Sequence, residues 1–117
     1  MTGVIDLRHF FYNNTVFNNG GSTGINNWRP SSCTRMDWMF FQATGFNQPI
    51  GDWDTSSVTD MNNMFRAEAS NHYMIFDQDI GSWDVSNVSN FQLFMYNRRA
   101  YSAFNNGGSP SIEGVGT

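Results

Sequence analysis

An internal repeat limits the fold of this chain more than any other feature. Three copies of one pattern begin with Phe, Ile and Trp, followed eight residues after the Trp by Met or Phe. Their leading residues are Phe17, Ile25 and Trp28, then Phe46, Ile50 and Trp53, then Phe76, Ile80 and Trp83. Repeats of 20–50 residues are typical of stacked arrays, since one copy is too short to bury its own apolar residues.

The repeat period divides the chain into a single domain with defined internal boundaries. Phe17, Phe46, Phe76 and Phe104 lie 29, 30 and 28 residues apart. We therefore expect one solenoid domain over residues 1–117. It consists of a half-repeat at 1–16, repeats at 17–45, 46–75 and 76–103, and a half-repeat at 104–117. Stacked copies should place Trp28, Trp53 and Trp83 in one buried column and the four Phe side chains in another.

Each copy contains two pieces that suggest different secondary structure. Residues 49–54 suit a short extended segment. Val58, Met61, Met64 and Phe65 then follow at the spacing of a helical stripe of about two turns. The predicted fold class is therefore an α/β repeat, a short solenoid with one strand and one helix in each coil of about 28–30 residues.

Composition and motifs argue against several functions. Lysine is absent and the net charge is −4, which argues against a nucleic-acid partner. No apolar run is long enough to span a membrane. The sequence holds no nucleophile elbow, phosphate-binding loop or zinc spacing, so we expect neither an enzyme nor a cofactor. Calcium stays open as an alternative, because several aspartates lie near the expected strands. These are Asp52, Asp54, Asp77, Asp79 and Asp84.

The repeat resembles a motif of bacterial and viral surface proteins. The segments FNQPIGDWDTSSVTDMNNMF and FDQDIGSWDVSNVSNF are similar to F-N-Q-x-I-x-x-W-D-V-S-x-V-T-x-M-x-x-M-F repeats, which are related to BspA-like leucine-rich repeats. The resemblance covers nearly the whole chain and implies a right-handed, leucine-rich-repeat-like solenoid. It also implies a role in adhesion, attachment or scaffolding at a cell or virion surface, with no catalytic residues. The first copy departs from the motif at Arg29 and Pro30.

The two half-repeats suggest that the chain associates with itself. The back half of a repeat stands at the N-terminus and the front half at the C-terminus, so the second could be completed by the first in the next molecule. We therefore predict a structural subunit that stacks head to tail into an extracellular or virion-associated filament. The residues predicted to form this contact are Val4, Leu7, Phe10, Phe11, Phe104, Ile112 and Val115.

A second function stays open on two features that interrupt the repeat. Trp38 takes a position where the other copies carry Asn63 and Leu93, and residues 68–75 form an insertion. Trp38, His72, Tyr73 and Met74 are candidate contacts for a ligand or a lateral partner. The alternative is thus an adhesion module, on a cell surface or a phage structural protein, that recognises a glycan or receptor. No signal peptide is visible, and the expected location is the extracellular surface or a virion.

Overall fold

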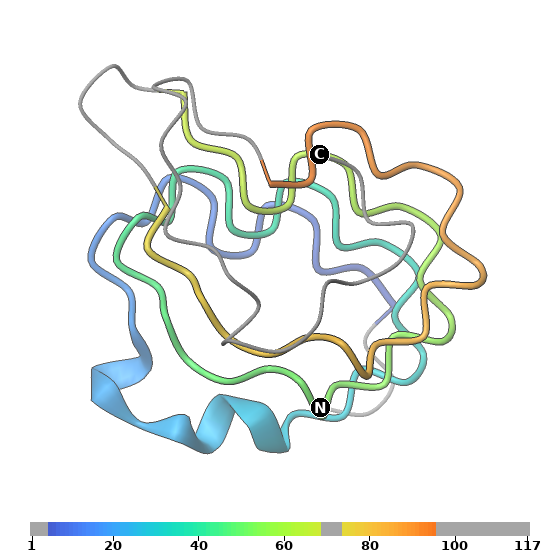
Figure 1. Cartoon of the computed structure of the whole chain (residues 1–117), viewed down its shortest axis with the longest axis horizontal. Helices are drawn as coiled ribbons and strands as arrows, with labels where there is room; N and C mark the ends of the chain where they lie inside the picture. The colour runs from blue at the N-terminus through green and yellow to red at the C-terminus, as the bar shows by residue number, and fades with distance from the viewer. Residues whose placement is uncertain (1–4, 69–73, 96–117) are drawn as a thin grey trace.

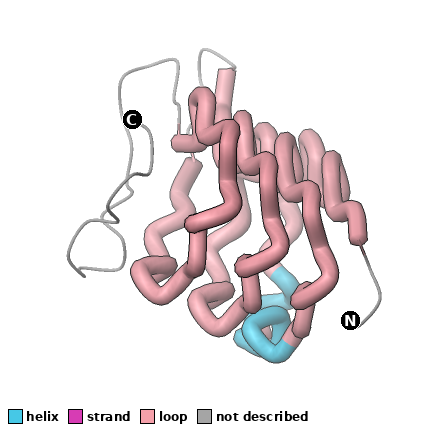
Figure 2. The backbone as a smooth tube through the Cα atoms, turned by 90° about the vertical axis from the view of Figure 1, so that its right-hand side faces the viewer, coloured by secondary structure: helices cyan, strands magenta, loops and turns pink. Residues whose placement is uncertain are grey.

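Successive copies of the repeat lie one on another in the computed structural model, which describes residues 5–68 and 74–95. Figure 2 shows the coils side by side, and Figure 1 shows that their traces follow the same path around the molecule. Isolated parallel bridges join each coil to the next, and they run Asp6 to Arg35, Arg35 to Asp60, and Asp60 to Asn90. Equivalent residues of neighbouring copies are therefore in register across the stack.

The predicted fold class is wrong. Residues 5–68 and 74–95 contain no β-strand and no α-helix. Their helical elements are two short 3-10 helices, η1 (Asn19–Gly21) and η2 (Thr23–Asn27), both in the Gly-rich first copy. The radius of gyration is 13.0 Å, close to the ~13 Å of a compact 100-residue domain. The chain is a compact globule of turns and loops, and a solenoid with a strand and a helix in each coil does not describe it.

The expected helical stripe is a series of tight turns. The N–H of Met64 donates to the carbonyl of Met61, three residues back, at 3.3 Å. Between them Asn63 has φ of +56°, which no α-helix permits. The N–H of Phe65 instead donates to Phe94 of the next copy at 2.9 Å. Apolar residues three apart fit such turns as well as a helix, and hydrogen bonds to the neighbouring coil decide between them.

The expected strand is also a turn. The N–H of Trp53 donates to the carbonyl of Ile50 at 3.2 Å, and Trp83 does the same to Ile80 at 3.1 Å. The backbone therefore reverses where an extended segment was predicted. The carbonyl of Ile50 also accepts a hydrogen bond from the next copy, through the indole N–H of Trp83 at 2.9 Å.

The predicted ring columns are confirmed over the described residues. Trp53 stacks between Trp28 and Trp83, with ring centroids 5.9 and 6.4 Å apart and planes within 4° of parallel. Phe46 stacks between Phe17 and Phe76, at 5.8 Å from each. Phe104 lies outside the described residues. These columns form the core, together with the buried Ile and Met residues between them. No helix in the described part of the chain is long and apolar enough to span a membrane.

Candidate interface at the two ends of the stack

One hydrogen-bond pattern joins every pair of neighbouring coils. In the back half of the repeat, alternate N–H groups of one coil donate to carbonyls of the next. The first pair of each set is Leu7 to Arg35, Met36 to Asp60, and Met61 to Asn90, all at 3.0 Å. Because the N–H groups of this set all donate to the following coil, the stack has two chemically different ends.

The end formed by the third copy presents unused donors. Phe91, Leu93 and Met95 align with Met61, Asn63 and Phe65, whose N–H groups all donate to the following copy. None of the three later N–H groups has a partner in residues 5–68 and 74–95. Around them, apolar side chains remain half-buried at Val85, Val88, Phe91 and Met95. The aligned Val58 and Met61 of the second copy are 0% exposed. Among residues 5–68 and 74–95, no coil covers this part of the third copy as the third copy covers the second.

The opposite end presents unused acceptors. Asp6, Arg8 and Phe10 align with residues of the second and third copies whose carbonyls accept hydrogen bonds from the preceding coil. Within the described ranges, no donor reaches these three carbonyls. Four large apolar side chains of this first coil are exposed, at Ile5, Phe10, Tyr12 and Val16. The carbonyl acceptors at this end thus have the same spacing along the chain as the N–H donors at the other end, so the two sets are complementary.

Trp28 lacks a hydrogen bond that the other two Trp residues of its column make. The indole N–H of Trp53 donates to the carbonyl of Ile25 at 2.9 Å, and that of Trp83 to Ile50 at 2.9 Å. Trp53 and Trp83 therefore each donate a hydrogen bond to the copy before their own. Trp28 begins the column, and its indole N–H has no acceptor among the described residues. The ring is half-buried and meets Phe10 edge to face, with centroids 6.1 Å apart.

The predicted self-association residues differ in how far they are exposed. Phe10 is 54% exposed, but Leu7 and Phe11 are buried at 1% and 8%. Phe11 stacks on Phe40 with centroids 5.3 Å apart, so it belongs to the core of this chain. Leu7 and Phe11 therefore lie in the core of their own chain, and their role in self-association stays a prediction. Val4, Phe104, Ile112 and Val115 lie outside the described residues.

Trp38 lies in an aromatic cluster on the side of the stack. It is half-buried in a turn with φ of +61°, and its ring lies 4.9 Å from Phe41, 6.1 Å from His9 and 6.3 Å from Tyr12. Met74 is 1% exposed, and its role in the contact surface of the insertion stays a prediction. His72 and Tyr73 lie outside the described residues.

The family comparison bears on the chain as a whole. A family model described as "Mycoplasma protein of unknown function, DUF285" matches residues 5–109. The chain belongs to the DUF285 family. This family is related to the BspA-like surface repeat proteins, so the predicted resemblance is confirmed at that level. No curated protein and no solved structure matches the chain.

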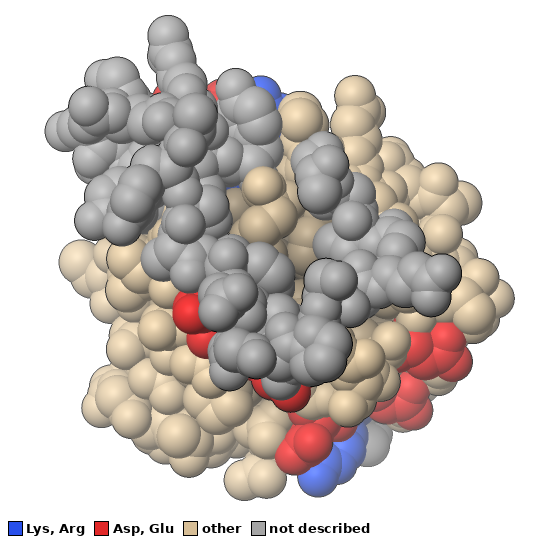
Figure 3. All heavy atoms as spheres, in the orientation of Figure 1, with Lys and Arg blue, Asp and Glu red and all other residues tan. Residues whose placement is uncertain are grey.

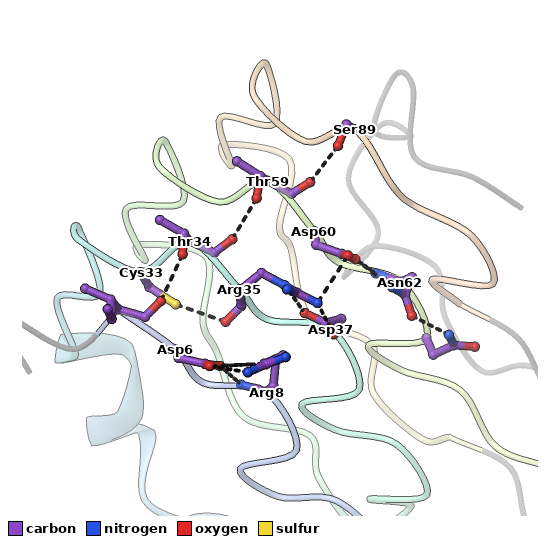
Figure 4. A network of polar contacts seen from close by, with 12 residues as sticks. Asp6, Arg8, Cys33, Thr34, Arg35, Asp37, Thr59, Asp60, Asn62 and Ser89 are labelled. Atoms are coloured by element: carbon purple, nitrogen blue, oxygen red, sulfur yellow. Dashed lines mark hydrogen bonds and ion pairs between the residues drawn. The ribbon is translucent and has the colours of Figure 1, made fainter.

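A polar column runs along one side of this DUF285 chain (Figure 4). The hydroxyls of Thr34, Thr59 and Ser89 each donate to a carbonyl of the preceding coil, at 3.1–3.2 Å. Beside them, the Arg35 guanidinium binds Asp37 at 2.8 Å and reaches Asp60 at 3.5 Å. The hydrogen bond to Asp37 raises the pKa of Arg35. Side chains therefore reinforce the same coil-to-coil contacts that the backbone makes.

Three of the five aspartates considered for calcium act as turn residues in the DUF285 chain. Asp54 accepts hydrogen bonds from the backbone and the hydroxyl of Ser56, at 3.0 and 2.6 Å. Asp84 does the same for Ser86. Asp79 accepts from the N–H of Gly81 at 2.8 Å. In residues 5–68 and 74–95, no three His, Cys, Asp or Glu side chains gather into a group that could hold a metal ion.

These turns predict how the stability of the DUF285 chain depends on pH. Hydrogen bonds from Ser56 lower the pKa of Asp54 below its ordinary 3.8, and those from Ser86 do the same for Asp84. A lowered folded-state pKa stabilises the fold above pH 3.8, and this contribution is lost as pH falls through the folded-state value. We expect thermal melts to show falling stability below about pH 4. Asp54→Asn, which keeps the acceptor oxygen and does not titrate, should weaken that dependence. An unchanged slope would contradict the assignment.

Proposed function

We propose that this DUF285 chain is a non-catalytic structural protein that stacks head to tail into an extracellular or virion-associated filament. The observation that carries the proposal is the complementarity of the two ends. Counting only partners within residues 5–68 and 74–95, one end offers unused N–H donors, and the other offers unused carbonyl acceptors at the same repeat positions. An open ladder of this kind is a template for pairing with another chain.

The internal ladder sets the register of the proposed contact. Phe91 takes the place of Met61, and Asp6 takes the place of Asn90, which accepts from Met61 at 3.0 Å. The N–H of Phe91 should therefore donate to Asp6 of the next molecule. By the same alignment Ile5 should donate to Ser89, as Thr34 donates to Ile5 within the chain at 2.9 Å. Such a contact joins two different surfaces and does not close on itself, which produces an open filament.

The side chains around the ladder support the same arrangement. The first coil exposes Ile5 at 63% and Phe10 at 54%, and the third copy leaves Val88 and Phe91 half-buried. Exposed apolar side chains gathered at one place commonly mark a contact surface. On the face drawn in Figure 3, most described atoms belong to uncharged residues, with acidic groups along the lower edge. Because every chain carries a net charge of −4, association between chains should strengthen as salt screens the repulsion.

A second candidate function is adhesion through the aromatic cluster around Trp38. His9 and Tyr12 are exposed beside the half-buried Trp38 ring, with their own ring centroids 5.3 Å apart. Exposed aromatic side chains supply contact area at low entropic cost. The relation of the family to surface proteins supports a cell-surface glycan or receptor as the partner. A chain that stays monomeric at high concentration would favour this function over the filament.

Replacing Phe10 with Asp should separate association from folding. Phe10 is 54% exposed, so the substitution should change the free energy of unfolding by less than about 1 kcal/mol. Because Phe10 lies at the end of the stack, the new aspartate would place a charge against the apolar residues of the neighbouring molecule. We expect sedimentation of the parent chain to show association that grows with concentration, and the variant to associate at least about tenfold more weakly, a loss of ~1.4 kcal/mol.

Ile75→Asp is the matched control for this experiment. Ile75 is 38% exposed and is the last residue of the second copy, outside residues 5–16 and 85–95 that form the proposed contact. The Ile75→Asp variant carries the same added charge outside the proposed contact. Its association should therefore equal that of the parent chain. Equal weakening by both substitutions would show a general charge effect and contradict the proposed interface.

A further inference from the structure

We propose that residues 104–115 of a second copy dock against the Trp28 end of the stack and supply the acceptor that its indole N–H lacks. This inference rests on the proposed head-to-tail stacking and identifies the segment that makes the contact in the front half of the repeat. The partner is thus a second molecule of this chain, which makes the contact through one short segment.

The unfilled position at Trp28 is defined by the rest of its column. Trp53 and Trp83 each place their indole N–H 2.9 Å from a carbonyl, that of Ile25 and that of Ile50. In both cases the acceptor is the Ile that stands three residues before the Trp of the preceding copy. Trp28 therefore needs an Ile carbonyl from a front half-repeat placed before it.

The sequence offers one segment that matches this requirement. Residues 104–112 read FNNGGSPSI, and residues 17–25 read FNNGGSTGI, so seven of nine positions are identical. Ile112 thus occupies the position of Ile25, whose carbonyl accepts from Trp53. Seated one coil before Trp28, the segment would place the Ile112 carbonyl at the Trp28 indole N–H, and the Phe104 ring on Phe17.

An asparagine column gives the same register independently. The side-chain oxygen of Asn18 accepts from the backbone N–H of Asn47 at 2.7 Å, and that of Asn47 accepts from Asp77 at 2.9 Å. The backbone N–H of Asn18 has no partner in the described part of the chain. Asn105 aligns with Asn18, so its side-chain oxygen would accept from that N–H. The Asn18 backbone N–H before η1 and the Trp28 indole N–H after η2 thus both match acceptors in the same segment.

Disulfide trapping between two single-cysteine chains tests the docking directly. Cys33 is first replaced with Val, which the aligned Val58 and Val88 carry. One chain then carries Asn18→Cys and the other Asn105→Cys, and they are mixed with oxidised glutathione at a concentration where the parent associates. We expect a covalent dimer of the two chains. The Asn18→Cys/Asn47→Cys double variant is the positive control, because these residues touch within one chain. Asp54→Cys mixed with Asn18→Cys is the negative control.

The outcomes distinguish this inference from the proposed function. A parent chain that stays monomeric contradicts both. Association without a link between Asn18→Cys and Asn105→Cys, or with one no faster than the Asp54→Cys control, contradicts the docking segment and leaves the filament standing. A link that closes within one chain carrying both cysteines, in monomers, would show that the segment covers its own stack, and would also overturn the inference.

Trp28→Phe supplies a second measurement that needs no cross-link. It keeps a six-membered aromatic ring in the column and removes the five-membered ring of the indole with its N–H. Because that N–H has no partner within the described residues, the melting temperature of dilute protein should change little. Association should weaken about 3- to 10-fold, the effect of one lost hydrogen bond. Unchanged association of this variant would contradict the proposed hydrogen bond to Ile112.

Discussion

Replacing Trp53 with Ala should remove about 3–5 kcal/mol from the free energy of unfolding, the usual cost of emptying a buried Trp site. Trp53 is 3% exposed and lies in the middle of its column, in contact with the rings of Trp28 and Trp83. The change removes both stacking contacts and the hydrogen bond from the indole N–H to the Ile25 carbonyl. Since a domain of this size is stable by only about 5–15 kcal/mol, urea denaturation should show a large shift in midpoint.

Two other substitutions identify the source of this loss. Trp53→Phe keeps a ring in the column but removes the indole N–H, so it should cost about 0.5–1.5 kcal/mol through the lost hydrogen bond to the Ile25 carbonyl, which still accepts from the Trp28 backbone N–H. Trp38→Ala removes a half-buried ring on the side of the stack and should cost clearly less than Trp53→Ala. A loss below about 1 kcal/mol for Trp53→Ala would mean that the column is not the core, and would contradict the packing described above.

The packing of this chain could be predicted from its sequence, whereas its secondary structure could not. Constant spacing between Trp28, Trp53 and Trp83 requires that equivalent residues meet, and the stacked rings confirm it. The helix expected over residues 58–65 is absent because apolar spacing alone does not say where backbone N–H groups go. Asn63, at φ of +56°, turns the chain so that alternate N–H groups point to the next coil.

The candidate interface could be predicted only in part, for a related reason. Repeat alignment identifies which residues are equivalent, but it does not show which of them their own chain already covers. Phe10 and Phe11 are adjacent in sequence, yet one is 54% exposed and the other is 8% exposed beneath Phe17 and Phe40. The unused donors of the third copy and the unused acceptors of the first coil are backbone groups, and no residue type signals them.

Gly51→Ala should destabilise the chain because the next coil leaves no room for a side chain at this position. A Cβ built on Gly51 would fall on the backbone oxygen of Asp79, in the third copy. The half-repeat at 1–16 and the first copy meet in the same way at Gly45, where a Cβ would lie 2.6 Å from the carbonyl oxygen of Thr15. Backbone oxygen cannot turn away as a flexible side chain can, so the coils must separate locally. Such overpacking costs about 1–3 kcal/mol.

Gly24→Ala is the matched control for Gly51→Ala. Its Cβ would lie 3.3 Å from the hydroxyl oxygen of Ser22, a side-chain atom that can move. We therefore expect its denaturation midpoint to stay close to that of the parent chain, while Gly51→Ala shifts to lower urea concentration. The first copy carries Asn26 at the position of Gly51, and its amide binds Asp52 at 2.7 Å. A side chain is thus accommodated where the coils leave space for it. If Gly51→Ala proved as stable as Gly24→Ala, the close approach of the second and third copies at Asp79 would be refuted.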